Sequence, residues 1–116
     1  MQGNLSVIIP NYNHAQHLSE CFKRLSLQSM LPKEIIIIDD GSKDNSVKVI
    51  EKELSKFTKK ASNVSVLFIK NRVNKGVIFS ENLGARKASQ DYIYFLSVDD
   101  TIESSFIERS LLALYK

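Results

Sequence analysis

Two hydrophobic periods alternate along this chain. Four short apolar runs rich in β-branched residues predict buried strands, at residues 5–9, 35–38, 64–69 and 92–96. Each run is followed by a segment whose apolar residues recur at the three- and four-residue spacing of a helix. Strands that alternate with helices in this way pair in parallel through right-handed crossovers. The sequence therefore predicts an α/β fold with an open, mainly parallel sheet of βα units and helices on both faces.

Apolar stripes place the four expected helices. The stripes consist of Leu18, Cys21, Phe22 and Leu25; of Val47, Ile50, Leu54 and Phe57; of Phe79, Leu83, Ala85 and Ala88; and of Phe106, Ile107, Leu111 and Leu114. Pro10 is expected to end the first strand, because proline cannot donate to a sheet ladder. Residues 30–32 should end helical structure before the second strand. Ser42 or Asp44 can cap the second helix.

The composition describes one globular domain and excludes several classes of function. With 116 residues, 43% of them hydrophobic, and a net charge of +3, the chain lacks the strong basic face of a nucleic-acid-binding protein. The lysine-rich residues 48–60 are best interpreted as a solvated helix face, with contact to anionic lipid as the alternative. Cys21 has no partner for a disulfide, which favours a reducing compartment, and we expect a cytoplasmic protein. The chain has no long apolar run, so we expect no transmembrane segment in it.

Polar motifs follow three of the predicted strands, at the sheet edge where such folds bind ligands. After the first strand, Tyr12 could stack on a flat base beside Pro10 and Asn13, although an ordinary Asx-type turn explains the same residues. After the second strand, the consecutive carboxylates of Asp39 and Asp40 should point to opposite sides of the sheet. Either could accept a hydrogen bond from a ribose or a base, or the motif could be a plain strand-to-helix turn.

The third motif, residues 97–101, contains Asp99 and Asp100. Adjacent carboxylates at a strand end suit Mg²⁺ or Mn²⁺, which take one or two carboxylates together with phosphate and water. An exposed acidic loop is the simpler interpretation of this motif alone. Lys70, Arg72 and Lys75 could add cationic contacts to a phosphate. The chain has neither a GxGxxG fingerprint nor a Walker A motif, which argues against a dinucleotide site and a P-loop site. The three motifs at one edge of the sheet together favour a nucleotide diphosphate that is bound through its base and through a metal ion.

These blocks resemble those of the family 2 inverting glycosyltransferases. The resemblance begins at residues 6–13, continues through 38–42, and includes Asn74-Lys75-Gly76, residues 82–85 and residues 92–100. It implies a Rossmann-like fold of GT-A type in which residues 1–116 form the nucleotide-diphospho-sugar-binding portion. The acceptor-binding portion and the catalytic base, an acidic residue, would lie beyond Lys116.

The resemblance also implies roles for individual residues. Pro10, Tyr12 and Asp40 would contact the nucleotide, usually UDP, with Asp39 in support. Asp99 would contact the ribose and, with Asp100, the divalent ion. Two features depart from the family pattern: Ser97 stands where the family commonly has aspartate, and Ile78, Phe79 and Glu81 replace small residues and an arginine.

The function expected from this resemblance is metal-assisted transfer of a sugar, with inversion, from a UDP-sugar to a saccharide or lipid-linked acceptor in polysaccharide biosynthesis. Any contact with the cytoplasmic face of a membrane would be made by parts outside this chain. Two alternatives remain open. The chain could be a nucleotide-binding module without transferase activity, or a phosphate-receiver signalling domain, which would need its acid pair after the first strand, where residues 11–13 stand.

Overall fold

The structure, a computed structural model, describes residues 2–115 as alternating strands and helices. In chain order the elements are β1 (Gln2–Asn11), α1 (Ala15–Ser26), β2 (Leu31–Asp40), α2 (Ser46–Lys60), β3 (Ser65–Asn71), α3 (Val77–Lys87), β4 (Tyr92–Phe95) and α4 (Phe106–Leu114). The strands form one open sheet in the order β3-β2-β1-β4, and every neighbouring pair is parallel. The predicted α/β fold class is therefore confirmed.

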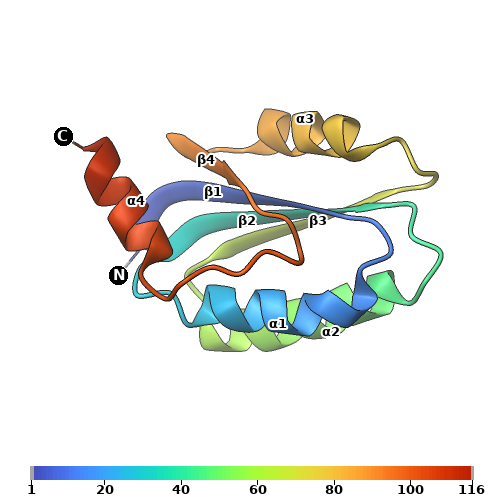
Figure 1. The fold of residues 1–116 in the computed structure, drawn as a ribbon, viewed down its shortest axis with the longest axis horizontal. Helices are drawn as coiled ribbons and strands as arrows, with labels where there is room; N and C mark the ends of the chain where they lie inside the picture. Colours follow the sequence, from blue (N-terminus) through green and yellow to red (C-terminus); the bar gives the residue numbers. More distant parts are fainter. Residues whose placement is uncertain (1, 116) are drawn as a thin grey trace.

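Helices cover both faces of this sheet. Helices α1 and α2 lie side by side under one face, α3 lies across the other, and α4 packs at the end of the sheet where β1 begins (Figure 1). The strands alternate between the two layers: Val7, Ile9, Ile35 and Ile37 join the core under α1 and α2, while Ile8, Ile36 and Ile38 form the smaller core under α3. A continuous isoleucine run is thus buried because each face has a cover.

Helix α1 buries the stripe expected from its sequence. Leu18, Cys21, Phe22 and Leu25 are all buried. Burial raises the pKa of the Cys21 thiol to about 12, so this thiol stays protonated at neutral pH. Cys21 behaves as the small buried hydrophobe that the sequence predicts.

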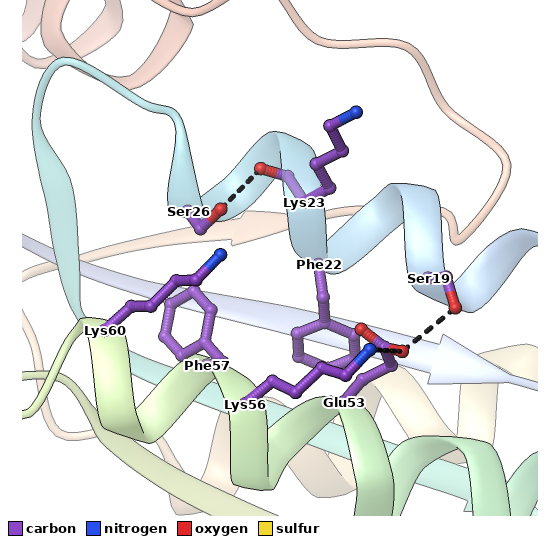
Figure 2. A pocket seen from close by; sticks show the side chains of 8 residues that line it. All are labelled: Ser19, Phe22, Lys23, Ser26, Glu53, Lys56, Phe57 and Lys60. Atoms are coloured by element: carbon purple, nitrogen blue, oxygen red, sulfur yellow. Dashed lines mark hydrogen bonds and ion pairs between the residues drawn. The ribbon is translucent and has the colours of Figure 1, made fainter.

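Helix α2 differs from its expected stripe, because a carboxylate replaces an apolar side chain. Ile50 and Phe57 are buried, but Val47 and Leu54 are only half-buried, and Glu53 is buried between the two helices. Ser19 Oγ of α1 donates to Glu53 Oε2 over 3.0 Å, and Lys56 Nζ lies 3.8 Å from the same oxygen (Figure 2). These contacts satisfy Glu53 at the wall of a cavity of about 260 Å³ between α1 and α2.

The N-cap residue of α2 is Asn45, without a side-chain cap, rather than the expected Ser42 or Asp44, although Asp44 binds the first turn. Asp44 Oδ1 accepts from Ser46 N over 2.9 Å, and Asp44 Oδ2 accepts from Ala15 N over 3.1 Å. Partial burial raises the pKa of Asp44, but these hydrogen bonds outweigh that effect and leave the pKa below its usual value. One carboxylate therefore ties the start of α1 to the start of α2.

The predicted stripe of α3 is right only in part: Leu83 and Ala88 pack against the smaller core, but the rest of the pattern differs. Phe79 is 40% exposed and Ala88 follows the end of the helix, while Ser80 and Gly84 are the buried residues. A Cβ atom added at Gly84 would lie 2.4 Å from Ile8 Cγ2. Helix α3 approaches β1 so closely that only small side chains fit at the point of contact, which apolar spacing did not indicate.

Two prolines lie inside strands, which corrects the expected boundaries. Pro10 pairs with Ile38, and β1 continues to Asn11. The Ile8 carbonyl faces β4, because it accepts from Leu96 N. Since backbone groups two residues apart in a strand face the same side, the nitrogen of Pro10 also faces the β4 side, at a point beyond the end of β4. Leu31 and Pro32 belong to β2 but precede its pairing with β3, which begins at Glu34. Pro32 pairs with Gly3 at the start of the β1–β2 ladder, next to the irregularity of β1 between Gly3 and Ser6, so both prolines lie near the ends of their strands.

Helix α4 follows Ser105 and buries Ile107 and Leu111 of its expected stripe. Leu114 is 54% exposed, so it does not belong to the buried stripe. Within residues 2–115, none of the helices combines the length and the apolar character needed to span a membrane.

The close approach of α3 to β1 predicts the effect of filling Gly84. Gly84→Ala forces the new methyl group against Ile8, an overpacking that typically costs about 1–3 kcal/mol, against about 1 kcal/mol gained in helix propensity. Because 2.4 Å is far inside van der Waals contact and Ile8 is fully buried, we expect the upper part of this range, about 2–3 kcal/mol, and hence a net loss of about 1–2 kcal/mol in the free energy of unfolding, measured by urea denaturation. The exposed Arg86→Ala in the same helix is the control and should change stability by less than about 0.5 kcal/mol. A Gly84→Ala protein as stable as the parent would contradict the packing.

Candidate functional site

A cavity of about 240 Å³ opens at the carboxyl ends of the strands. Its walls come from the end of β1, the end of β2, the loop between β3 and α3, and the loop after β4. Four of the residues singled out from the sequence line it: Pro10, Tyr12, Asp40 and Asp99. Residues far apart in the sequence meet here because parallel strands end at one edge of the sheet.

Asp39 does not line the cavity, because its side chain closes the turn after β2. Its Oδ1 accepts from Ser42 Oγ over 2.7 Å and from Asn11 Nδ2 over 3.0 Å, and its Oδ2 accepts from Ser42 N over 3.0 Å. Asp39 is 1% exposed, so these contacts replace water. The carboxylate joins the ends of β1 and β2 on the face covered by α1 and α2.

Asp40 points to the opposite face and holds the loop between β3 and α3. Its Oδ1 accepts from Lys75 N over 2.8 Å and from Asn71 Nδ2 over 2.9 Å, and its Oδ2 accepts from Gly76 N over 2.8 Å. The expected divergence of the two aspartates is thus confirmed. Asp40 both lines the cavity and orders the loop that forms one of its walls.

The turn after β1 presents an aromatic ring to the cavity. Tyr12 is 38% exposed at the cavity wall. Asn13 follows in a left-handed conformation, with φ of 57°, and its Oδ1 accepts from Lys43 N over 2.8 Å. Asn13 does not line the cavity and instead ties this turn to the turn after β2. His14 is exposed and also lines the cavity.

Asp99 and Asp100 face different cavities. Asp99 is exposed, lines the cavity with Asp40, and forms no hydrogen bond or ion pair with other residues of 2–115. Asp100 lines a neighbouring cavity of about 470 Å³ beside Tyr94 and α4, and its Oδ2 accepts from Ser97 N over 3.2 Å. Burial, and then the charge of Asp100, raise the pKa of Tyr94.

These donors fit a divalent ion that takes few protein ligands. Across residues 2–115, no three acidic, histidine or cysteine side chains gather as a preformed metal site. Mg²⁺ and Mn²⁺, however, bind through one or two carboxylates together with phosphate and water. The uncommitted carboxylate of Asp99 at the cavity wall meets that requirement, and Asp100 is its neighbour in the chain.

Sequence reasoning missed three polar residues that line the cavity or contact Asp40 at its wall. Asn71 and Ser80 lie beside Asp40, with Asn71 Nδ2 donating to Ser80 Oγ over 3.3 Å. Asn74 Nδ2 donates to the Asp40 carbonyl over 3.4 Å and lines the cavity. Asn74 lay in a block quoted for the family resemblance, but Ser80 sits where an apolar stripe was expected. Its role depends on the packing of α3.

Comparison with known proteins gives a consistent family. A sequence model described as Glycosyl transferase family 2 matches residues 6–116. The cholesterol galactosyltransferase of Borreliella burgdorferi is 35% identical over 104 residues, which are 90% of this chain and 27% of that protein. The chain therefore spans about a quarter of the length of this relative.

Two solved structures share the fold. Residues 1–349 of TarS from S. aureus, in complex with UDP, match with a TM-score of 0.79 at 23% identity, over 96% of this chain and 32% of that one. The mannosyltransferase PcManGT from Pyrobaculum calidifontis, in complex with GDP-Man and Mn²⁺, matches with a TM-score of 0.71 at 18% identity, over 85% of this chain and 28% of that one. The expected GT-A type of sheet is thus confirmed.

The bonds of Asp40 predict a test of the cavity wall. Asp40→Asn replaces one acceptor oxygen by a donor facing backbone N–H groups, and an unpaired buried N–H typically costs about 1–3 kcal/mol. We expect a loss of that size in urea denaturation, together with faster hydrogen exchange at the Lys75 and Gly76 amides. Asp99→Asn, at an exposed side chain, should change neither. Unchanged exchange in Asp40→Asn would contradict the role of Asp40 in ordering the loop.

Proposed function

Because the chain belongs to glycosyl transferase family 2, we propose that residues 1–116 form the nucleotide-sugar-binding portion of a glycosyltransferase. The enzyme would transfer a sugar from a UDP-sugar to an acceptor hydroxyl, with inversion at the anomeric carbon. The observation that carries this proposal is the single cavity in which Tyr12, Asp40 and Asp99 meet. An aromatic ring and carboxylates from different strand ends, on the walls of one cavity, suit a nucleotide bound through its base and through a metal-bound phosphate.

The nucleoside end of the donor would occupy the cavity itself. Its volume of about 240 Å³ is below the range of roughly 300–1,000 Å³ common for whole ligand sites, so the diphosphate and the sugar would extend past its rim. Tyr12 offers a ring for stacking on the base, and Pro10 keeps the turn beside it rigid. A carboxylate has about four lone-pair sites, and Asp40 uses three within the chain, which leaves one for a base or ribose donor.

The diphosphate would lie between the acidic loop and the loop after β3. Asp99 would hold a divalent ion, Mn²⁺ or Mg²⁺, with Asp100 beside it. When bound, such an ion stabilises the negative charge of the departing diphosphate. Lys75 and Arg72 are exposed on the loop that Asp40 orders and could bind phosphate oxygens. Lys75 Nζ lies 5.3 Å from the centroid of the Phe79 ring, which keeps it near the start of α3.

The acceptor side of the reaction is assigned outside residues 1–116. The chain spans 27% of the Borreliella relative and 32% of TarS, so the acceptor groove and the general base would belong to the rest of a full-length protein. That base would take the proton of the acceptor hydroxyl as its oxygen attacks the anomeric carbon. A saccharide or a lipid-linked saccharide is the expected acceptor. The same short span supports one alternative, a module that binds the nucleotide and transfers nothing.

The role of Tyr12 predicts how strongly UDP binds to variants of the 116-residue chain. Stacking of a base on an aromatic ring contributes about 1–3 kcal/mol, so Tyr12→Ala should weaken UDP binding roughly 5- to 150-fold in a calorimetric titration. Tyr12→Phe keeps the ring and should bind UDP nearly as well as the parent. GDP and TDP, titrated in parallel, test the choice of base. Equal affinity of the Ala variant and the parent would remove Tyr12 from the site.

The metal role of the acidic loop is tested by the same titration with and without Mn²⁺. We expect Mn²⁺ to strengthen UDP binding by the parent, and Asp99→Asn to remove most of that gain because it deletes the carboxylate at the cavity wall. Asp100→Ala should reduce the gain as well. Asp91→Asn, which changes an exposed acid at the opposite edge of the sheet, is the control and should keep it. A full Mn²⁺ effect in both variants of the acidic loop would reject the metal assignment.

A turnover assay with UDP-sugars, carried out on a longer form of the protein that extends beyond residue 116, separates the enzyme from the binding module. Both predict UDP binding, but sugar transfer requires the base and the acceptor groove. If a longer form of the protein transfers sugar, the binding-module alternative fails. If that form binds UDP-sugar without transfer or hydrolysis of any donor tested, the glycosyltransferase proposal fails.

A further inference from the structure

The acidic loop, defined here as residues 97–101, lies between two well-anchored segments. Leu96 and Val98 are buried in the core at one end, and Leu96 N donates to the Ile8 carbonyl over 2.9 Å. Beyond the loop, Gln28 of α1 binds the chain on both sides: its Nε2 donates to Glu103 O over 2.7 Å, and its Oε1 accepts from Ile107 N over 3.0 Å. Residues 99–101, between these anchors, are exposed and outside regular secondary structure.

A single side chain from elsewhere in the fold holds the middle of the acidic loop. Arg24 Nη1 donates to Thr101 Oγ1 over 3.0 Å and lies 3.4 Å from the Asp100 carbonyl. Within residues 2–115, no other side chain outside the loop forms a hydrogen bond or ion pair with residues 99–101. The other hydrogen bonds of the described loop are internal: Asp100 N donates to Ser97 O over 3.0 Å, and Ser97 N donates to Asp100 Oδ2.

Arg24 is itself held in place by its helix and by an ion pair. Its neighbours Cys21 and Leu25 are buried on the core side of α1, so the backbone of Arg24 belongs to a rigid element. Glu20, one turn earlier, forms an ion pair with Arg24, with Glu20 Oε1 3.3 Å from Arg24 Nε, and Nη1 is left to contact the loop. The planar guanidinium suits this arrangement, because its separate N–H groups can bind two partners at once.

We infer that Arg24 is a positioning residue for the donor site, which sets the acidic loop so that Asp99 faces the cavity. The inference rests on the proposed function. A loop ordered before the ligand arrives loses less conformational freedom when its carboxylate binds a metal-nucleotide complex. Arg24 would therefore strengthen the metal-dependent part of UDP binding, while the base, held near Tyr12 on another wall of the cavity, would be bound as before.

The test uses both ends of one hydrogen bond. Arg24→Gln removes the donor on α1, and Thr101→Val removes the acceptor in the loop with little change of shape. UDP is titrated into each variant and the double variant, with and without Mn²⁺. Arg109→Gln is the control, because Arg109 is an exposed arginine that pairs with Glu103 just beyond the acidic loop. Hydrogen exchange at the Asp100 amide of the free protein reports the order of the loop without any ligand.

Each single variant should lower the Mn²⁺-dependent affinity for UDP by about threefold to tenfold, the usual effect of one hydrogen bond. The metal-free affinity should stay the same, the double variant should be no weaker than either single one, and Asp100 exchange should quicken in both. Thr101→Val decides the question even if Arg24→Gln does not fold.

Three results would overturn the role of Arg24: parent-like affinities with Mn²⁺, an equal loss with and without Mn²⁺, or losses that add in the double variant. Failure of the proposed function has a different signature. If the parent chain shows no Mn²⁺-dependent UDP binding while Asp100 exchange still depends on Arg24, the metal-bound donor site is rejected and Arg24 is only an anchor of the loop.

Discussion

The parallel pairing of β1 with β2, buried on both faces, is the constraint on which the rest of the structure depends. It places residues 7–11 beside residues 35–39 and brings the polar ends of both strands to one edge. Because side chains alternate, consecutive residues at that edge face different layers. Asp39 consequently joins the turns under α1 and α2, while Asp40 faces α3 and the cavity. The register of this strand pair is therefore the reason that Asp39 and Asp40, although adjacent and chemically identical, have different roles.

Much of the candidate site consists of groups that order loops. Asp39, Asp40 and Asp44 each accept backbone N–H groups from a neighbouring turn, so the cavity walls are hydrogen-bonded to the sheet and helices. Asp99 differs from them, because its carboxylate forms no such contact within residues 2–115. A wall held by internal bonds with one uncommitted carboxylate on it suits a ligand that brings its own cation, which is the arrangement proposed for the nucleotide diphosphate.

The edge strand β4 is less covered by helices than the central strands β1 and β2. On the face covered by α3, Ile93 and Phe95 of β4 are 42% and 43% exposed, because α3 lies over β1 and β2 and does not reach β4. The central strands carry isoleucines on both faces, and each has a helix above it. The loops at the strand ends are therefore bound to the well-packed central elements of the described chain. Asp40 holds the loop between β3 and α3, and Arg24 and Gln28 hold the segment between β4 and α4.

The amino-acid sequence by itself determined the order of the elements, the parallel sheet, the stripe of α1 and the three polar motifs at one edge. These follow from local periodicity and from the rule that parallel strands end together. Only the tertiary structure decided that Ser80 and Gly84 face the sheet, that Glu53 is buried against Ser19, and that Asp99 and Asp100 line separate cavities. The physical reason is distance: these outcomes depend on how closely two elements approach and on which side of a turn a side chain leaves, and no spacing along one segment carries that information.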